Sequence, residues 1–397
     1  MIKSRSTLDI ALGIEYYSRP EVFLGIGVRA ELSPSSFKVY EEVYGLGTAV
    51  APEKPSGEVK CFKERKVLVI MCKTGISTLD VEWLLRRAGV KLEYWGIKDA
   101  NAETCQFAIL RCLRDVVITS GIVKGVKFYA LKSVDPGFTP KKHQLAGNLF
   151  EVLLTYTESD PERIVNTVEL SAGLSYLNYF GYQRFGTVRP VTHTIGRAIA
   201  VGDYDSALSY LIGYSSSSES PEVRYARKLF AEGYYKDSLR SFPKSFVIER
   251  SVLKKFIETG SSRKAITKGL PLGLLKFFVE SYQSYLFNRA LSMLASTASS
   301  IEDIEKKCEV LELPRPGILS QGCSKYSYES IMEDLGTRFE VANKSLFTKS
   351  IRESVFRVSD LRTTILTDGI VRLSFKLGRG SYATVYLREL LRDNLVI

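Results

Sequence analysis

The chain has 397 residues, a formal net charge of +11 at pH 7 and 45% hydrophobic residues. This length exceeds that of a usual single domain, and the apolar content suffices for packed cores, so we expect two domains. The apolar runs fall far short of the roughly 18 residues of a membrane span, and no apolar signal core follows the N-terminus. We therefore expect a soluble, cytoplasmic protein with no membrane partner.

Cysteine and histidine limit the possible chemistry. The six cysteines include no C-x-x-C pair and the chain has only two histidines, which argues against a metal site and a Ser-His-Asp arrangement. We predict that most cysteines are buried thiols. No G-x-x-x-x-G-K-[ST] segment is present, and Gly25-Ile26-Gly27 is too short for a dinucleotide fingerprint. Carboxylates and lysines must carry any chemistry, without metal or cofactor.

The basic residues are spread through the chain, beside 22 Tyr and 20 Phe. Phosphates attract such a surface and aromatic rings stack on exposed bases. Composition alone fits a nucleic-acid-binding surface and a merely solvated basic surface equally well.

Alternation of apolar and polar residues predicts a half-buried strand at residues 37–41, with Phe37, Val39 and Glu41 on one face. Further strands are predicted at 65–72 and 107–113, and 149–154 is an apolar run. Residues 79–88 read as a short amphipathic helix, with Leu79, Trp83 and Leu84 at helical spacing and Gly89 as its stop.

From about residue 171 the pattern becomes helical. Apolar and aromatic residues recur at helical spacing over 274–286, which indicates a long helix whose aromatic stripe packs in a core. Residues 373–377 alternate again, a turn follows, and 383–390 can form a helix. This order suggests one α+β domain interrupted by an insertion.

The stretch from Gly96 to Gln106 places Asp99 in a turn after an apolar segment, next to Lys98. An aspartate so placed can simply cap a helix or close an Asx turn. It is also a candidate nucleophile, and spacing alone does not decide between the two.

Four ordered blocks carry a resemblance that favours the catalytic interpretation. They are G-x-K-D-x-x-A-x-T-x-Q at 96–106, Gly147-Asn148-Leu149-Phe150, the NYFGYQRFG segment at 178–186, and Gly380-Ser381-Tyr382-Ala383-Thr384 with Arg388-Glu389. Together they resemble the TruD/Pus7 family of tRNA pseudouridine synthases, in its archaeal-like form.

The resemblance implies an α+β fold: a pseudouridine synthase core with a mixed, mainly antiparallel sheet and helices, at residues 1–170 and 351–397, and an inserted α/β TRUD domain at 171–350. It implies an isomerase that converts uridine to pseudouridine in tRNA, at uridine 13 or at uridine 35 of pre-tRNA. No metal, cofactor or guide RNA is expected, and we expect a monomer.

The resemblance also implies roles for single residues. Asp99 is the catalytic carboxylate, which either attacks C1′ of the ribose or removes the 2′ proton. Asn148 orients the catalytic loop and Phe150 stacks on the flipped base. Arg184 either approaches the RNA backbone or braces the domain junction.

One departure from the family pattern concerns the usual P-E-D-F segment, which reads Pro34-Ser35-Ser36-Phe37 here, with Phe37 assigned to substrate binding. The lysine expected six residues before Phe37 is replaced by Glu31, which would repel an ionised Asp99. We hypothesise that Arg29, two residues earlier, supplies the missing cation, with Lys98 as a second candidate. The alternative is an RNA-binding family member with weak or lost catalysis.

Overall fold

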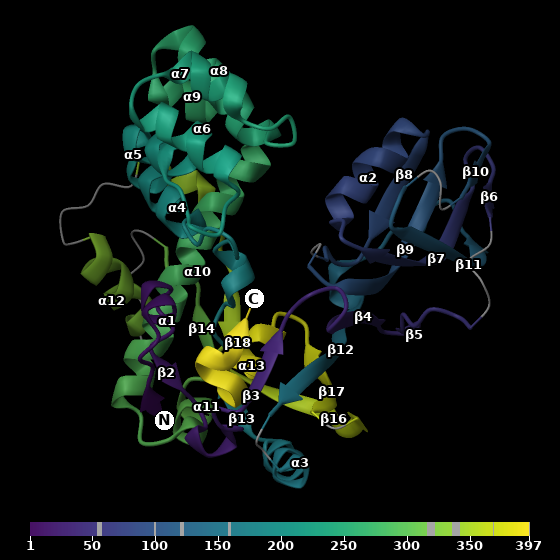
Figure 1. Ribbon diagram of the computed structural model, residues 1–397, viewed down its shortest axis with the longest axis vertical. Helices are drawn as coiled ribbons and strands as arrows, with labels where there is room; N and C mark the ends of the chain where they lie inside the picture. The colour runs from purple at the N-terminus through teal and green to yellow at the C-terminus, as the bar shows by residue number, and fades with distance from the viewer. Residues whose placement is uncertain are drawn as a thin grey trace. The chain divides into compact units, whose positions relative to one another are not determined.

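The computed structural model describes residues 1–53, 58–98, 101–119, 123–157, 160–315, 322–335, 342–367 and 369–396 (Figure 1). Packing divides the chain into two compact units. The sheet unit contains residues 19–175 and 356–397, and the helical unit contains residues 1–18 and 176–355. Among the described helices, none is long and apolar enough to cross a membrane.

The sheet unit is built on a large, mainly antiparallel sheet whose main path runs β11-β7-β9-β4-β12-β17-β16. Its elements are β3 (Val28–Glu31), β4 (Phe37–Val43), β5 (Gly47–Thr48), β6 (Val59–Cys61), β7 (Lys66–Thr74), α2 (Thr78–Arg87), β8 (Val90–Tyr94), β9 (Glu103–Cys112), β10 (Val116–Ile118), β11 (Val126–Val134), β12 (Leu145–Tyr156), α3 (Pro161–Leu170), β16 (Val355–Thr367), β17 (Ile370–Gly378), α13 (Ala383–Leu391) and β18 (Leu395–Val396).

Strand β12 lies in the middle of this path, between β4 and β17. It pairs antiparallel with both, whereas β4 and β9 run parallel. Gly147 lets β12 approach β17 closely, because a Cβ there would lie 2.1 Å from the Leu377 carbonyl oxygen. This close pairing sets the register of Asn148 and Phe150.

Strand β4 has the alternation that the sequence predicts, with Phe37, Val39 and Glu41 on its buried face. The other predicted strands are also present, as β7, β9 and β17, and the apolar run at 149–154 lies in β12. The predicted helix at 79–88 is α2, but its apolar face was wrongly predicted: Val81 and Leu85 are buried, whereas Leu79 and Trp83 are more than half exposed. Arg87 lies over the Trp83 ring instead.

The helical unit is dominated by the long helix α10, which covers the predicted aromatic stripe. Its other elements are β1 (Ile2–Lys3), α1 (Thr7–Ala11), β2 (Tyr16–Tyr17), α4 (Thr192–Val201), α5 (Tyr204–Leu208), α6 (Pro221–Ala231), α7 (Tyr235–Ser241), α8 (Val247–Thr259), α9 (Ser262–Gly269), α10 (Leu272–Thr297), α11 (Ile301–Lys307), β14 (Val310–Glu312), α12 (Ser324–Leu335) and β15 (Ile351–Glu353). The short strand β13 (Ser175–Leu177) spans the point where the chain passes between the units.

The α+β fold with a mainly antiparallel sheet is thus confirmed. The predicted division into 1–170 with 351–397 and 171–350 stays a prediction about the catalytic domain. The compact units have similar boundaries in the middle of the chain, but residues 1–18 belong to the helical unit.

Most cysteines are buried, as predicted, but the expectation that they are thiols is wrong. All six are paired, as Cys61–Cys112, Cys72–Cys105 and Cys308–Cys323. Cys72 and Cys105 are cross-strand partners in the β7–β9 pair, so the sheet register itself brings them together. Sequence spacing does not reveal such long-range pairs.

Candidate active site

Side chains from β9 and α2 hold the backbone just before Asp99. Gln106 of β9 donates from Nε2 to the Gly96 carbonyl oxygen at 2.9 Å. Thr78, the first residue of α2, accepts from the Lys98 N–H at 3.0 Å. Asp99 itself lies outside the described residues, so the structure defines the approach to it rather than its side chain.

Gly96 leaves space for two buried charged groups at this turn. A Cβ on Gly96 would lie 2.9 Å from Lys98 Nζ and 3.1 Å from Glu41 Oε1. Both contacts are tighter than ordinary van der Waals distances, so a side chain at position 96 would shift the ends of these two side chains.

Lys98 and Glu41 form a buried ion pair, with Nζ and Oε1 2.7 Å apart. The Glu41 side chain is fully buried and Lys98 is 8% exposed. The second Glu41 oxygen accepts from the Phe107 N–H at 3.2 Å. Burial raises the pKa of the Glu41 carboxyl, and the Lys98 ammonium partly opposes that rise.

Lys73, near the end of β7, places a second buried cation at this turn. Its side chain is 1% exposed. Nζ donates to the Lys98 carbonyl oxygen at 3.0 Å and to the Ile76 carbonyl oxygen at 2.8 Å. The Lys98 carbonyl belongs to the peptide that joins Lys98 to Asp99, so Lys73 brings positive charge to the bond that precedes the predicted catalytic residue.

Two buried oxygens on the same face of the sheet have no hydrogen-bond partner among the described residues. They are Thr104 Oγ1 on β9 and Asn148 Oδ1 on β12. The register pairs Lys73 with Thr104, and Asn148 with Glu41. Unsatisfied buried oxygens are costly in a folded protein, which favours a polar ligand at this face.

Phe37 and Phe150 belong to a buried aromatic stack. Their ring centroids lie 6.0 Å apart with nearly parallel planes, and Phe150 also stacks on Phe375 at 5.4 Å. Phe150 is 6% exposed and Phe37 8%. Phe150 lies two residues from Asn148 on β12 and therefore on the same face of the sheet, and stacking of Phe150 directly on a base stays a prediction.

The structure does not bring Arg29 and Glu31 to this cluster. Both are exposed on β3. Arg29 pairs with Thr155 at the far end of β12, seven residues from Asn148, which is about 23 Å along an extended strand. The hypothesis about Glu31 and Asp99 stays a prediction, and Lys73 and Lys98 are the buried lysines that the described residues bring to the turn.

Arg184 lies in the helical unit and is engaged by α10. Its guanidinium donates to Ser284 Oγ at 3.1 Å, pairs with Glu280 at 3.3 Å and lies over the Phe277 ring. These contacts lie within the helical unit, so both predicted roles of Arg184, RNA contact and bracing of the domain junction, stay predictions. Asn178, from the same block, bonds Arg352 through its side-chain oxygen at 2.7 Å, also within the helical unit.

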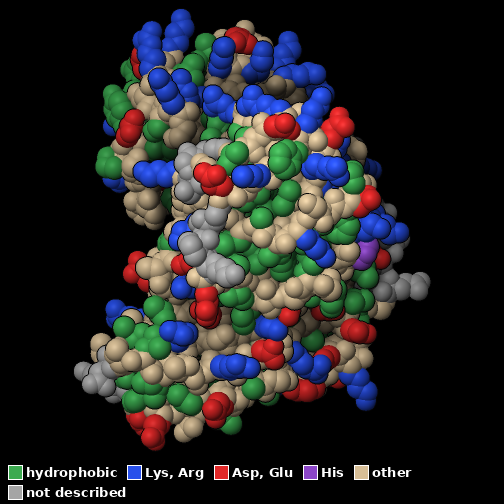
Figure 2. Space-filling view, turned by 90° about the vertical axis from the view of Figure 1, so that its right-hand side faces the viewer, with side chains coloured by type: hydrophobic (Ala, Val, Ile, Leu, Met, Phe, Trp, Pro, Cys, Tyr) green, Lys and Arg blue, Asp and Glu red, His purple; other side chains and the backbone are tan. Residues whose placement is uncertain are grey.

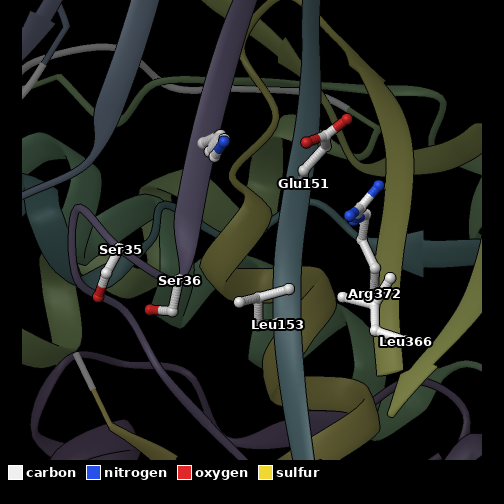
Figure 3. A pocket seen from close by; sticks show the side chains of 7 residues that line it. Ser35, Ser36, Glu151, Leu153, Leu366 and Arg372 are labelled. Carbon is white, nitrogen blue, oxygen red and sulfur yellow. The ribbon is translucent and has the colours of Figure 1, made fainter. Parts of the chain in front are cut away.

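A separate pocket of about 240 Å³ opens on the opposite face of the sheet (Figure 3). Its lining comprises Ser35, Ser36, Lys38, Glu151, Leu153, Leu366 and Arg372. Because Glu151 and Leu153 alternate with Phe150 and Val152 along β12, this pocket faces away from Asn148. None of the predicted site residues lines it.

Lys73 and Thr78 are the members of the cluster that the sequence analysis missed. A lysine that closes the apolar run Val67-Leu68-Val69-Ile70-Met71-Cys72 was a usable signal, because a charged residue in a strand buried on both faces needs a specific partner. Nothing local marked Thr78, whose role depends on where α2 begins. No group of three potential metal ligands occurs among the described residues.

Comparisons with known proteins identify the family. The family model described as tRNA pseudouridine synthase D (TruD) matches residues 11–308. The chain belongs to this family of enzymes. The predictions of family membership and of a tRNA pseudouridine synthase, which is an isomerase, are thereby confirmed.

Relatives and a solved structure extend the match over nearly the whole chain. A probable tRNA pseudouridine synthase D of Saccharolobus solfataricus is 32% identical over 98% of this chain and 97% of its own. The corresponding protein of Methanococcus aeolicus is 34% identical over 91% of this chain and 94% of its own. A crystal structure of a putative member from Methanosarcina mazei has a TM-score of 0.64 at 21% identity and covers 98% of both chains, which shows the shared fold.

Proposed function

We propose that this chain isomerises uridine to pseudouridine in tRNA, with Asp99 as the catalytic carboxylate. The observation that supports this most strongly is the buried Lys73 at the turn before Asp99, beside the ion pair of Lys98 and Glu41. Lys98 is adjacent in sequence, and Lys73 bonds the carbonyl of the connecting peptide. A carboxylate must be ionised to attack C1′ or to remove the 2′ proton, and nearby cations favour that state.

The reaction needs no net gain or loss of atoms. The bond from C1′ to N1 breaks, the uracil turns, and C1′ bonds to C5; the C5 proton is lost and N1 takes up a proton. Asp99 starts this sequence in either route. This isomerisation is balanced in atoms and electrons, so it requires no metal or redox group.

Thr104 and Asn148 are proposed to bind the edge of the flipped base. Uracil presents one N–H donor between two carbonyl acceptors. Asn148 Oδ1 can accept from that N–H, and the Thr104 hydroxyl can donate to a carbonyl. Binding would satisfy both oxygens that are otherwise without a partner among the described residues, and it would hold the base during rotation.

The tRNA substrate is proposed from family membership and from the net charge of +11. Within tRNA, uridine 13 is the proposed target, with uridine 35 of pre-tRNA as the second candidate. The two targets are separable because each can be replaced by cytidine in a transcript.

The test is to incubate the purified chain with tRNA and pre-tRNA transcripts and to map pseudouridine by carbodiimide-dependent primer extension. We expect a stop with the wild-type chain that disappears when the target uridine is cytidine. Asp99→Asn should abolish the stop while leaving tRNA affinity within about twofold, because the amide keeps the shape of the carboxylate and loses its basicity.

Two results would count against the proposal. Pseudouridine formation by Asp99→Asn at the wild-type rate would remove Asp99 from the mechanism. Tight tRNA binding without any stop, at enzyme in excess over tRNA, would favour the RNA-binding alternative.

A further inference from the structure

The helical lobe formed by α6 to α9 and the start of α10, residues 221–280, concentrates the positive charge of the chain. These 60 residues contain 13 Lys and Arg against 6 Asp and Glu. Their excess of seven positive charges is the larger part of the total of +11. Figure 2 shows Lys and Arg side chains crowded over this lobe, which is at the top of the view.

Helix α9 presents cations outward in the most regular way. Arg263, Lys264 and Lys268 are exposed, whereas Ala265 and Ile266 are buried in the core of the lobe. Ser261 caps the helix by accepting from the Lys264 N–H. The apolar face of α9 is thus fully used in packing, and its polar face consists of positive charge.

These cations have no acidic partner among the described residues, unlike others in the same lobe. Lys228 pairs with Glu232, Arg240 with Asp237, and Lys255 with Glu258. Arg263, Lys264 and Lys268 make no ion pair there. Lys254 on α8 is exposed and makes no ion pair among the described residues, although it interacts electrostatically with Glu258. Clustered exposed cations attract a polyanion at long range.

We propose that the exposed face of α9, with Lys254 of α8, binds the phosphate backbone of the tRNA substrate. This inference rests on the proposed function and adds a second RNA-binding surface, in the other compact unit from the candidate active site. Evenly charged, rigid helices suit the sequence-independent recognition of phosphates. Its role is to raise affinity for the folded tRNA, not to take part in the chemistry.

The packing of α9 favours a nucleic acid over an anionic membrane. A membrane-binding helix would need an apolar face free for lipid, and that of α9 is buried in the core.

The experiment compares two triple variants that lose the same charge. The test variant is Arg263→Ala/Lys264→Ala/Lys268→Ala, and the matched control is Lys228→Ala/Arg240→Ala/Lys255→Ala, which removes three ion-paired cations from the surface of the same lobe. Thermal melting and circular dichroism first establish that both fold. KM and kcat for pseudouridine formation, and the dependence of tRNA affinity on salt, are then measured.

We expect the test variant to raise KM for tRNA about 10-fold or more, with kcat unchanged, and to lower the slope of log affinity against log salt by about 2 to 3. The control should change KM less than threefold. If both variants raised KM equally, loss of net charge alone would explain the effect and the proposal would be wrong. An unchanged KM in the test variant would also overturn it.

A measurement that does not depend on turnover separates this proposal from the proposed function. Lysine acetylation of the wild-type chain, followed by mass spectrometry, should show Lys254, Lys264 and Lys268 protected by tRNA and Lys228 unprotected. Activity without this protection would refute the α9 surface alone. Protection without activity would keep the surface and refute the proposed catalysis.

Discussion

Lysines in the two units of this protein serve opposite purposes. In the sheet unit, Lys73 and Lys98 are almost fully buried, and each is fixed by named oxygens within 3.0 Å. In the helical unit, Lys264 and Lys268 of α9 are exposed and pair with no acid among the described residues. A buried cation orients and stabilises nearby groups, whereas an exposed cation is available to a polyanion.

The contrast matters because the same residue type gives different measurable consequences in the two settings. Desolvation makes a buried charge dependent on its partner, so removing either member should affect stability or catalysis strongly. Solvent screens an exposed charge, so removing it should affect only long-range or ligand interactions. Four predictions test this difference.

The largest effect is expected from breaking the buried pair of Glu41 and Lys98. Glu41→Leu should lower the free energy of unfolding by about 3 to 5 kcal/mol, because it leaves Lys98 as a buried cation without its carboxylate. Urea denaturation measures this loss. The double variant Glu41→Leu/Lys98→Met should recover most of it, and a double variant as unstable as the single one would show that the charge is not the cause.

The contrast between a largely buried and an exposed side chain also applies to the two histidines, His193 and His143. Burial lowers the pKa of His193 to about 4 from 6.5, although Asp334 nearby acts in the opposite direction. Because the pKa is lower in the folded state, the contribution of neutral His193 to the free energy of unfolding is complete above about pH 6.5. It is lost as pH falls toward 4, by up to roughly 3 kcal/mol.

Urea denaturation between pH 7 and 4 checks the sign of this dependence. His193→Phe should flatten the decline, since Phe185 and Tyr285 already surround the ring. His143→Gln, at an exposed position, should leave the decline as in the wild type. An identical pH dependence in all three chains would mean that His193 does not titrate differently on folding.

A change at Lys73 should act on catalysis. Lys73→Met is expected to lower kcat about 100-fold with a smaller change in KM, because the peptide before Asp99 loses its bond and the site loses a cation. The pH that half-activates kcat should rise, since a carboxylate without its cation is harder to ionise. Lys264→Met, an exposed counterpart, should keep kcat. An unshifted pH profile for Lys73→Met would assign the lysine a purely structural role.

The smallest effect concerns stability at the exposed surface. Lys264→Ala should leave the thermal midpoint unchanged, because the side chain has no ion pair among the described residues and alanine favours the helix. Differential scanning calorimetry of the wild type and the variant is sufficient. A clear drop in the midpoint would mean that α9 depends on this lysine for folding, which would weaken its assignment to RNA binding.

Periodicity predicted most of the sheet and the long helix because burial imposes it locally. The strand with Phe37, Val39 and Glu41 inward was predicted from alternation and is present as β4. The face of α2 was predicted wrongly: Trp83 looked like a core residue, but Val81 and Leu85 fill that position. Two apolar stripes on one short helix are equally periodic, and only the sheet beneath decides which one is buried.

The candidate site was predictable only in part. The motif at 96–106 pointed to Asp99, Lys98 and the turn at Gly96. Arg29 was chosen as the cation from its proximity in sequence to the altered segment, yet β3 pairs with the far end of β12. Lys73 reaches the turn because β7 pairs with β9, a contact between distant parts of the chain.

The sequence by itself determined the family, the strand and helix content and the position of the predicted catalytic carboxylate, since local patterns and motifs record these directly. The tertiary structure alone decided which cations lie at the turn, which oxygens are left for a ligand and which lysines remain exposed. Those features depend on strand register and on packing between segments far apart in the chain, and local sequence patterns predict neither.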